Sequence, residues 1–298
     1  MQIVESRREL QLLADQERAR GQRIALVPTM GALHAGHLSL VDEGRKRADQ
    51  VWVSIFVNPT QFNEAHDFEG YPREPARDLE ACRAAGVDLV YTPGVEDVYP
   101  EGALTWVDVE DLTLPLCGAS RPGHFRGVTT VVSKLFLAAK PHVAVFGQKD
   151  FQQLAVIRRM ARDMGFDVEI VGGATVREPD GVALSSRNVR LGPEARRQAV
   201  ALVRALDAAE AAVAAGERDH RALLGVVRAE IAKASQAQLD YADLRDPESL
   251  ENAPETLAGA TLLALAVNFT PDHDGAGADV RLIDNRVLLG EQAVGDPQ

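Results

Sequence analysis

The chain has 298 residues, of which 46% are apolar, and a formal net charge of −12 from 44 acidic and 32 basic side chains. The apolar fraction excludes wholesale disorder, and the length allows one large domain or two smaller ones. An acidic balance argues against a protein that coats nucleic acid, which needs a basic surface. The net charge does not exclude binding of small anions, because backbone amides, Arg and Lys can gather at one site on an acidic protein.

Export and membrane insertion are not expected. The N-terminal segment has no apolar run of signal-peptide type, and no stretch approaches the roughly 20 apolar residues of a membrane span. Cys82 and Cys117 lie far apart and lack zinc-ligand spacing. We therefore expect reduced thiols in a cytoplasmic protein that uses neither a membrane nor a nucleic acid as partner.

The first part of the chain alternates between short apolar runs and amphipathic segments. A helix is expected after Ser6, which has capping-box spacing to Glu9, and Ile24 to Val27, closed by Pro28, indicates a buried strand. Further helices are expected over 36–48, 75–85, 125–139 and 151–164, and further strands over 51–57, 87–91, 143–146 and 168–171. This alternation predicts a Rossmann-like α/β fold with a doubly wound parallel sheet covered on both faces.

The composition changes after about Asn188. An Ala-rich helix is expected over 195–215 and another over 222–234, followed by strands over 239–244, 261–267 and 280–283. Helices first and strands later predict a second, smaller α+β domain, with limits of 1–180 and 181–298 and the second domain closing over the site. The segment 271–277 is expected to be a plain turn, because Ile283 stands where a calcium loop needs its closing Glu.

The strongest chemical signal follows the first strand, in the sequence Pro-Thr-Met-Gly-Ala-Leu-His-Ala-Gly-His at 28–37. Ligands of open α/β sheets bind beyond the carboxyl ends of strands, and the next helix offers free amides to an anion. Gly31 and Gly36 permit close approach of the backbone, so His34 and His37 can face one phosphate. Zinc is a rival use of this pair, with no third ligand evident. P-loop, dinucleotide-binding and nucleophile-elbow motifs are absent from the sequence.

Two further segments place polar groups after strands. Gln61 can bind a carboxylate or a hydroxyl through its amide, although an exposed loop glutamine is the simpler interpretation. Lys149 stands at a helix start, where a cation without a partner would oppose the helix dipole. This local conflict points to a functional role. Asp150 is either an N-cap or a catalytic group, and Gln153 can share a face with this site.

Two loops carry additional cations. Ser185, Ser186 and Arg187 offer two hydroxyls and a planar guanidinium to a triphosphate, or they form a surface loop leading into a helix. The segment 121–127 adds two arginines and a histidine with a weaker case.

Taken together, these segments resemble the pantothenate synthetase (pantoate–β-alanine ligase) family of the HIGH-motif nucleotidyltransferase superfamily. Residues 34–37 match the HIGH motif, and residues 184–187 resemble the KMSKS-like loop. More specific is their combination with Asn58-Pro59-x-Gln61-Phe62, Tyr71-Pro72-Arg73, Gly123-His124-Phe125-x-Gly127-Val128 and Gly147-Gln148-Lys149-Asp150. The resemblance runs from about residue 26 to residue 285.

The resemblance implies an ATP-dependent ligase that joins pantoate to β-alanine through pantoyl adenylate, with Mg²⁺ as partner of ATP, in a homodimer. It implies catalytic roles for His34, His37 and Lys149, with His37 as proton donor, and pantoate contacts for Gln61 and Gln153. Gln61 is also implied to lie near β-alanine. The implied ATP contacts are Met30, Gly31, Ala32, Leu33, His34, Ala35, Gly36, His37, Gly147, Gln148, Lys149, Asp150, Val176, Leu184, Ser185, Ser186 and Arg187. A simple adenylyltransferase and a nucleotide-binding regulatory module remain the alternatives.

Three positions depart from the family pattern. Thr60 stands where Met or Leu is usual, which predicts a change in the pantoate pocket, and Leu184 replaces a frequent Met. Arg77 takes the place of one member of an acidic pair linked to metal. Asp78 is then the candidate for a protein ligand of magnesium.

Overall fold

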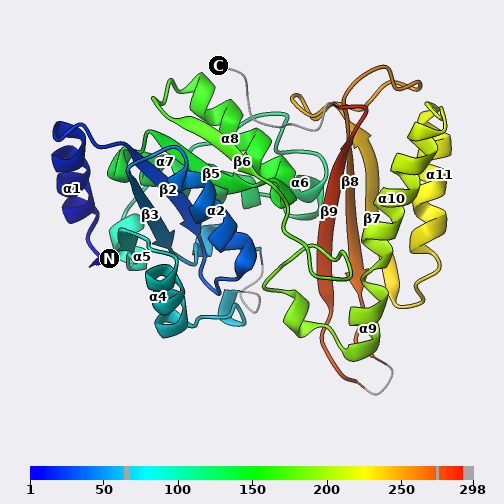
Figure 1. Ribbon diagram of the computed structural model, residues 1–298, viewed down its shortest axis with the longest axis horizontal. Coiled ribbons are helices and arrows are strands. Elements are labelled where there is room, and N and C mark those ends of the chain that lie inside the picture. Colours follow the sequence, from blue (N-terminus) through cyan, green and yellow to red (C-terminus); the bar gives the residue numbers. More distant parts are fainter. Residues whose placement is uncertain (64–67, 273–274, 291–298) are drawn as a thin grey trace. The chain divides into compact units, whose positions relative to one another are not determined.

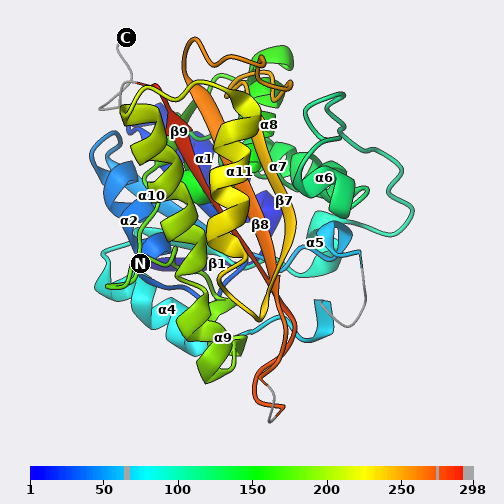
Figure 2. The same cartoon turned by 90° about the vertical axis from the view of Figure 1, so that its right-hand side faces the viewer.

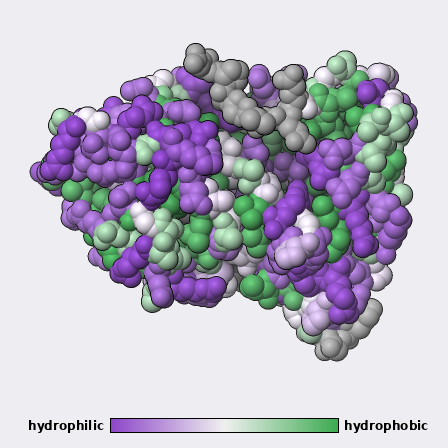
Figure 3. Space-filling view, in the orientation of Figure 1, coloured by the Kyte–Doolittle hydropathy of each residue, from purple (hydrophilic) through white to green (hydrophobic). Residues whose placement is uncertain are grey.

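The computed structural model describes residues 1–63, 68–272 and 275–290. The chain divides into two compact units, Met1–Val176 and Arg177–Gln298 (Figure 1). Within the described ranges, no helix is both long and apolar enough to cross a membrane. The faces of the units seen in Figure 3 are mostly hydrophilic, with smaller hydrophobic patches between the polar side chains.

The first unit is built on a six-stranded parallel sheet with the order β1-β4-β3-β2-β5-β6. The strands are β1 Gln2–Val4, β2 Ile24–Thr29, β3 Gln50–Ile55, β4 Leu89–Tyr91, β5 Val143–Gly147 and β6 Glu169–Gly173. From β2 the chain moves one way through β3 to β4, and from β5 it moves the other way to β6. The predicted doubly wound sheet is therefore confirmed. The order in which the chain adds strands to the sheet reverses between the parallel neighbours β2 and β5. Ligands of such folds bind at this point.

Helices cover both faces of this sheet, because alternate strand residues are apolar on each side. On one face Val27, Val53 and Val145 pack with Leu40 of α2 (Ala35–Arg45) and Cys82 of α4 (Pro75–Ala84). On the other face Phe136 of α7 (His124–Ala139) meets Phe146 of β5 edge to face. The remaining helical segments of this unit are α1 Arg7–Ala19, η1 Pro59–Gln61, α5 Val95–Val98, α6 Cys117–Ser120, α7 His124–Ala139, η2 Gln148–Asp150 and α8 Phe151–Asp163.

Local signals set several boundaries as predicted, but several strands, β2 and β9 among them, run further than expected. The side chain of Ser6 accepts a hydrogen bond from the amide of Glu9 and caps α1. Pro28 does not end β2, which continues to Thr29 beside β3. On its other side β2 pairs with β5 only through Ala25 and Leu26, so Pro28 lies beyond the doubly paired part of the strand. The short edge strand β1 was not predicted, because three residues carry too little pattern.

The second unit is a three-stranded antiparallel sheet, β7-β8-β9, with two helices packed against it. The strands are β7 Ala237–Arg245, β8 Thr261–Phe269 and β9 Val280–Leu288, and the other elements are η3 Asn188–Arg190, α9 Pro193–Gln198, α10 Ala201–Ala214 and α11 His220–Ile231. Figure 2 shows α10 and α11 lying over this sheet. The prediction of a smaller α+β part is confirmed.

The single helix expected over 195–215 is wrong, since the chain forms α9 and α10 instead. The amide of Leu202 bonds to the carbonyl of Ala199, a tighter turn that separates the two helices. Alanine favours helix everywhere, so the sequence carries no signal for this break. Asp272, from the segment before β9, fixes α9 by accepting hydrogen bonds from the amides of Glu194 and Ala195. Residues 273–274 of the predicted turn lie outside the described residues.

Candidate active site

His34 and His37 lie at the N-terminus of α2, directly beyond the carboxyl end of β2. His34 is the N-cap residue, and its Nδ1 accepts a hydrogen bond of 3.1 Å from the amide of Gly36. The Nδ1 of His37 accepts a hydrogen bond of 3.3 Å from the amide of His34, and the ring centroids are 4.1 Å apart. Since both Nδ1 atoms accept, each neutral ring carries its proton on Nε2. The site therefore presents two N–H donors at the N-terminus of a helix, the positive end of its dipole.

Both imidazoles are held neutral. Burial is the main cause that lowers the pKa of His34, assisted by the charge of Lys149 and opposed by Asp150. Burial, followed by the neighbouring His34, lowers the pKa of His37 to about 3; Asp150 opposes this shift and Lys149 adds to it. The electrostatic influence of Lys149 and Asp150 on both rings means that the end of β5 and the end of β2 form one site.

A pH dependence of stability follows from His37. The unfolded chain binds a proton at this residue near pH 6.5, whereas the folded protein binds it only near 3. Folding stability should therefore fall as the pH drops through this window, by about 1–2 kcal/mol for His37 at pH 5. Urea unfolding at pH 7 and pH 5 measures the loss of folding stability between the two pH values. This loss should be smaller in His37→Gln than in the wild type by the contribution of His37. Equal losses in the two proteins would contradict the assignment.

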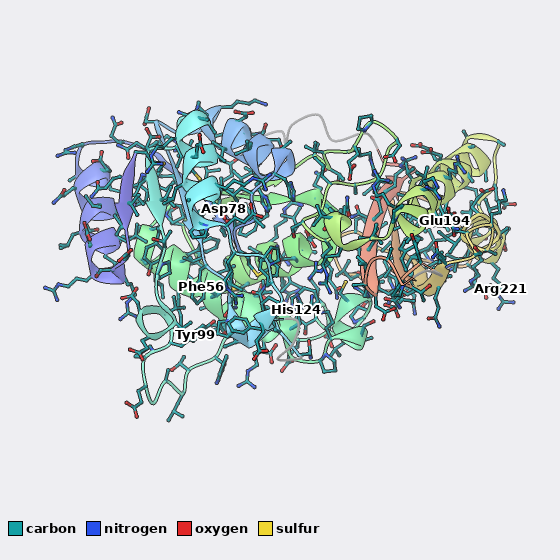
Figure 4. The ribbon with its side chains drawn as sticks, turned by 90° about the horizontal axis from the view of Figure 1, so that it is seen from below. Phe56, Asp78, Tyr99, His124, Glu194 and Arg221 are labelled. Carbon is teal, nitrogen blue, oxygen red and sulfur yellow. The ribbon has the colours of Figure 1, made fainter. Side chains whose placement is uncertain are left out.

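Asp78 shapes the turn that carries the two histidines. Its carboxylate is only 2% exposed, and its oxygens accept hydrogen bonds from the amides of Ala32 at 2.9 Å and Leu33 at 2.7 Å. Gly31 has a φ of +84°, and a Cβ there would lie 2.9 Å from Oδ2 of Asp78. The turn therefore requires glycine at 31 for conformation and for space. Figure 4 shows Asp78 on α4.

Gln61 is buried in η1 and does not lie in an exposed loop. Its Nε2 lies 3.0 Å from Sδ of Met30, the residue that follows β2, and its Oε1 accepts a hydrogen bond of 3.0 Å from Asn58. Its carbonyl contacts Nδ1 of His124 at 2.7 Å and accepts a hydrogen bond of 3.1 Å from Arg121. The structure thus brings the segments 28–37, 58–62 and 121–127 together.

The close contact between η1 and α7 yields a further prediction. A Cβ on Gly127 would lie 2.6 Å from the carbonyl oxygen of Thr60 and 2.9 Å from the amide nitrogen of Gln61. Because backbone cannot swing aside, Gly127→Ala should displace η1, cost about 3 kcal/mol of stability and move Gln61. Thermal or urea unfolding measures the cost.

The matched control is Gly225→Ala on α11, where a new Cβ would have no neighbour within 4 Å. That substitution should leave the free energy of unfolding unchanged or raise it by up to about 1 kcal/mol. A Gly127→Ala protein as stable as the control would refute the packing argument.

The remaining predicted residues of the first unit lie at the end of β5 and in the helix that follows. Gly147 ends β5, Gln148 to Asp150 form η2, and Asp150 occupies the N-cap position of α8 without a side-chain cap bond. Gln153 is partly buried on α8. Its neighbour Gln152 is buried and structural, since it bonds to the backbone of Leu112, Pro115 and Cys117.

The loop Leu184 to Arg187 belongs to the second unit, whereas Val176 is the last residue of the first. The hydroxyl of Ser185 accepts a hydrogen bond from the amide of Arg187. The segment before the loop is fixed by a two-pronged ion pair between Arg177 and Asp284 on β9, of which Asp284 is 2% exposed. These contacts give the loop a defined start within its own unit.

Comparison with known proteins identifies the family. The family model for pantoate–β-alanine ligase matches residues 2–287. The chain belongs to the pantoate–β-alanine ligase family. Pantothenate synthetase of Geobacter sulfurreducens is 53% identical over 292 residues, which are 98% of this chain and 100% of that protein. The relative from Geotalea daltonii is 51% identical over 98% of this chain and 100% of its own length.

Solved structures of the family agree with the fold. The crystal structure of pantothenate synthetase from Thermus thermophilus superimposes with a TM-score of 0.88 at 43% identity, covering 96% of this chain and 99% of that one. The pantoate–β-alanine ligase of Francisella tularensis, complexed with β-γ ATP and β-alanine, gives 0.75 at 31% identity, covering 96% and 97%. This protein is accordingly an enzyme of the same family.

Asp78, the candidate magnesium ligand, is engaged by the protein backbone. Both oxygens of Asp78 accept backbone hydrogen bonds, and Arg77 pairs with Glu74. In the described part of the chain no group of three or more His, Cys, Asp or Glu side chains could hold a metal ion. These residues do not by themselves make a magnesium site, which favours carboxylates and water. A metal-binding role for Asp78 stays a prediction.

No sequence pattern predicts a role for Asn58 or Tyr99, which meet beside Gln61. Asn58 was noted only as part of a motif, yet it is 1% exposed and bonds to Gln61. Tyr99 lies far along the chain from η1, and its hydroxyl donates to Asn58 Oδ1 at 2.9 Å. The polar Thr60 in place of an apolar residue was the one available signal that a hydroxyl partner lies nearby.

Proposed function

We propose that the protein joins pantoate and β-alanine to form pantothenate at the expense of ATP, in two half-reactions. A carboxylate oxygen of pantoate attacks the α-phosphorus of ATP, which gives pantoyl adenylate and releases pyrophosphate. The amine of β-alanine then attacks the acyl carbon, the acyl–oxygen bond breaks, and AMP leaves. The observation that carries the proposal is the meeting of two neutral histidines, Lys149 and buried Gln61 around the ends of β2 and β5, in a chain of this family.

The histidines and Lys149 suit the phosphates. Two Nε2–H donors, a cation and the positive end of the α2 dipole can stabilise charge that develops on the α-phosphate, and they need little reorganisation. With a pKa of about 3, His37 donates a hydrogen bond rather than a proton in the ligand-free protein. Binding of a polyphosphate would raise that pKa, because a nearby negative charge favours the imidazolium. This supports His37 as a proton donor once the nucleotide is bound.

The other contacts are proposed from the family. Residues 30–37, 147–150, 176 and 184 would line the nucleotide, and Ser185, Ser186 and Arg187 would bind its phosphates through two hydroxyls and a guanidinium. Gln61 and Gln153 would hold pantoate. We propose that Mg²⁺ arrives with ATP as its phosphate partner, and that the enzyme is a cytoplasmic homodimer, as the resemblance implies.

The test of the activity is the dependence of product formation on each substrate. AMP and an amide product should form only when ATP, pantoate and β-alanine are all present. ATP turnover at the same rate with and without pantoate would contradict the proposal. An adenylylated acid without amide product would indicate a simple adenylyltransferase, and ATP binding without pyrophosphate release would indicate a regulatory module.

Gln61 gives a prediction on substrate binding. Gln61→Ala should raise the KM for pantoate by about 10- to 100-fold, because a hydrogen bond to a charged group is lost, with a smaller effect on the KM for ATP. Gln61→Glu, which keeps the size but repels a carboxylate, should be at least as damaging. Equal losses for ATP and pantoate would argue against a pantoate contact.

A further inference from the structure

A cluster of hydroxyls lies against Asn58, on the opposite end of its amide from Gln61. Oδ1 of Asn58 accepts hydrogen bonds from the hydroxyl of Tyr99 and the hydroxyl of Thr60, both at 2.9 Å, and from the amide of Thr60 at 3.3 Å. The two hydroxyls are 3.1 Å apart. The acceptor end of this buried amide is therefore surrounded by donors.

The donor end of Asn58 faces only acceptors. Nδ2 donates to Oε1 of Gln61 at 3.0 Å and to the carbonyl of Gly127 at 3.1 Å. A reversed amide would set Nδ2 against the amide N–H of Thr60 and Oδ1 against the carbonyl oxygen of Gly127, and these two backbone groups would be left unsatisfied. The orientation of Asn58 is thus fixed by its neighbours.

This orientation passes on to Gln61. With Oε1 engaged by Asn58, the side chain of Gln61 has its NH₂ group toward Met30, whose thioether is a weak acceptor at 3.0 Å. A carboxylate or hydroxyl oxygen is a much better acceptor for the same N–H groups. Gln61 is consequently set to donate to an oxygen-rich ligand.

We propose that Tyr99 and Thr60 are positioning residues that act through Asn58 to make Gln61 present its NH₂ group to the oxygens of pantoate. The inference rests on the proposed contact between Gln61 and pantoate. It gives a role to Thr60, the residue that departs from the apolar side chain usual in the family. The hydroxyl of Thr60 supplies a second donor to Asn58 where an apolar residue would supply none.

The ring of Tyr99 is held firmly enough for this role. It stacks on Trp106 with centroids 6.2 Å apart, lies 6.4 Å from Phe56, and has Nζ of Lys134 at 5.2 Å from its centre. The same Nζ donates to the carbonyl of Val98 at 2.9 Å. Figure 4 labels Tyr99 and Phe56 in this part of the first unit. Burial raises the pKa of Tyr99, so its hydroxyl keeps the proton it donates.

The test compares Tyr99→Phe and Thr60→Val, which remove one hydroxyl each at nearly constant size. Each should raise the KM for pantoate by about 3- to 10-fold, with the KM for ATP, kcat and the melting temperature little changed. The KM for pantoate should rise further in the double variant than in either single variant. Thr60→Ser, which keeps the hydroxyl, should have the KM of the wild type. Tyr91→Phe, which removes a hydroxyl bonded to Asp97, is the matched control and should leave the KM for pantoate unchanged.

A double-mutant cycle with Gln61→Ala decides whether the effect passes through Gln61. In that background Tyr99→Phe and Thr60→Val should have no further effect on the KM for pantoate. Full additivity, an equal rise in the KM for ATP, or no effect of the single variants would overturn the relay. If Gln61→Ala alone left the KM for pantoate unchanged, the proposed Gln61 contact would fail, which is a result distinct from failure of the relay.

Discussion

His37→Ala should lower the single-turnover rate of adenylate formation by about 10²- to 10³-fold, while the protein stays folded. The expected loss is that of one pre-aimed hydrogen-bond donor at a site of developing charge. The imidazole ring cannot turn to offer its other nitrogen, because Nδ1 of His37 accepts a hydrogen bond from the amide of His34. Only Nε2 can therefore face the phosphates. Rapid-quench measurement of pyrophosphate release with ATP and pantoate gives the rate directly.

Two companion variants control this experiment. His37→Gln keeps an N–H donor near the position of Nε2 and should recover part of the rate. His220→Ala, on α11 of the second unit, removes an imidazole that faces the backbone of Ala253 and should leave the rate unchanged. Near-normal adenylation by His37→Ala would refute the role assigned to the residue.

Asp78→Ala should have the second large effect, on stability and on ATP binding together. The substitution leaves the amides of Ala32 and Leu33 without acceptors, and Leu33 is buried, so we expect a loss of about 3 kcal/mol in the free energy of unfolding. The turn that carries His34 should also loosen, which raises the Kd for ATP. Urea unfolding and calorimetric titration with ATP measure the two effects.

Asp78→Asn separates the hydrogen bonds from the charge. One of its two atoms still accepts from an amide while the other, an NH₂, opposes one, so its stability should lie between those of the wild type and Asp78→Ala. A stability equal to that of the wild type in both variants would show that the carboxylate does not hold the turn.

The fold was largely predictable because its signals are local. Apolar runs such as 24–27 and 143–146 mark central strands of a parallel sheet, and the capping box at Ser6 marks the start of α1. The break at Ala199–Val200 was not predictable, since alanine favours helix on both sides of it and only the tighter turn from Ala199 to Leu202 marks it.

The candidate site was predictable where motif and strand end coincide, and unpredictable where side chains meet across the fold. His34, His37 and Lys149 follow strands, so the topology rule places them together. The bonds from Asp78 to the 32–33 backbone and from Tyr99 to Asn58 join residues that no periodic pattern relates. Gln61 was taken alone as an exposed loop residue, yet packing of η1 against Gly127 buries it.

The proposed reaction begins when a carboxylate oxygen of pantoate attacks the α-phosphorus of ATP. Pantoate labelled with ¹⁸O in its carboxylate, turned over with ATP and β-alanine, tests it by mass spectrometry of the nucleotide. We expect one ¹⁸O in each AMP and none in pyrophosphate, because the bridging oxygen stays on phosphorus when the amine displaces AMP from the acyl carbon. Unlabelled AMP, or ADP with ¹⁸O in inorganic phosphate, would show that the carboxylate does not attack the α-phosphorus.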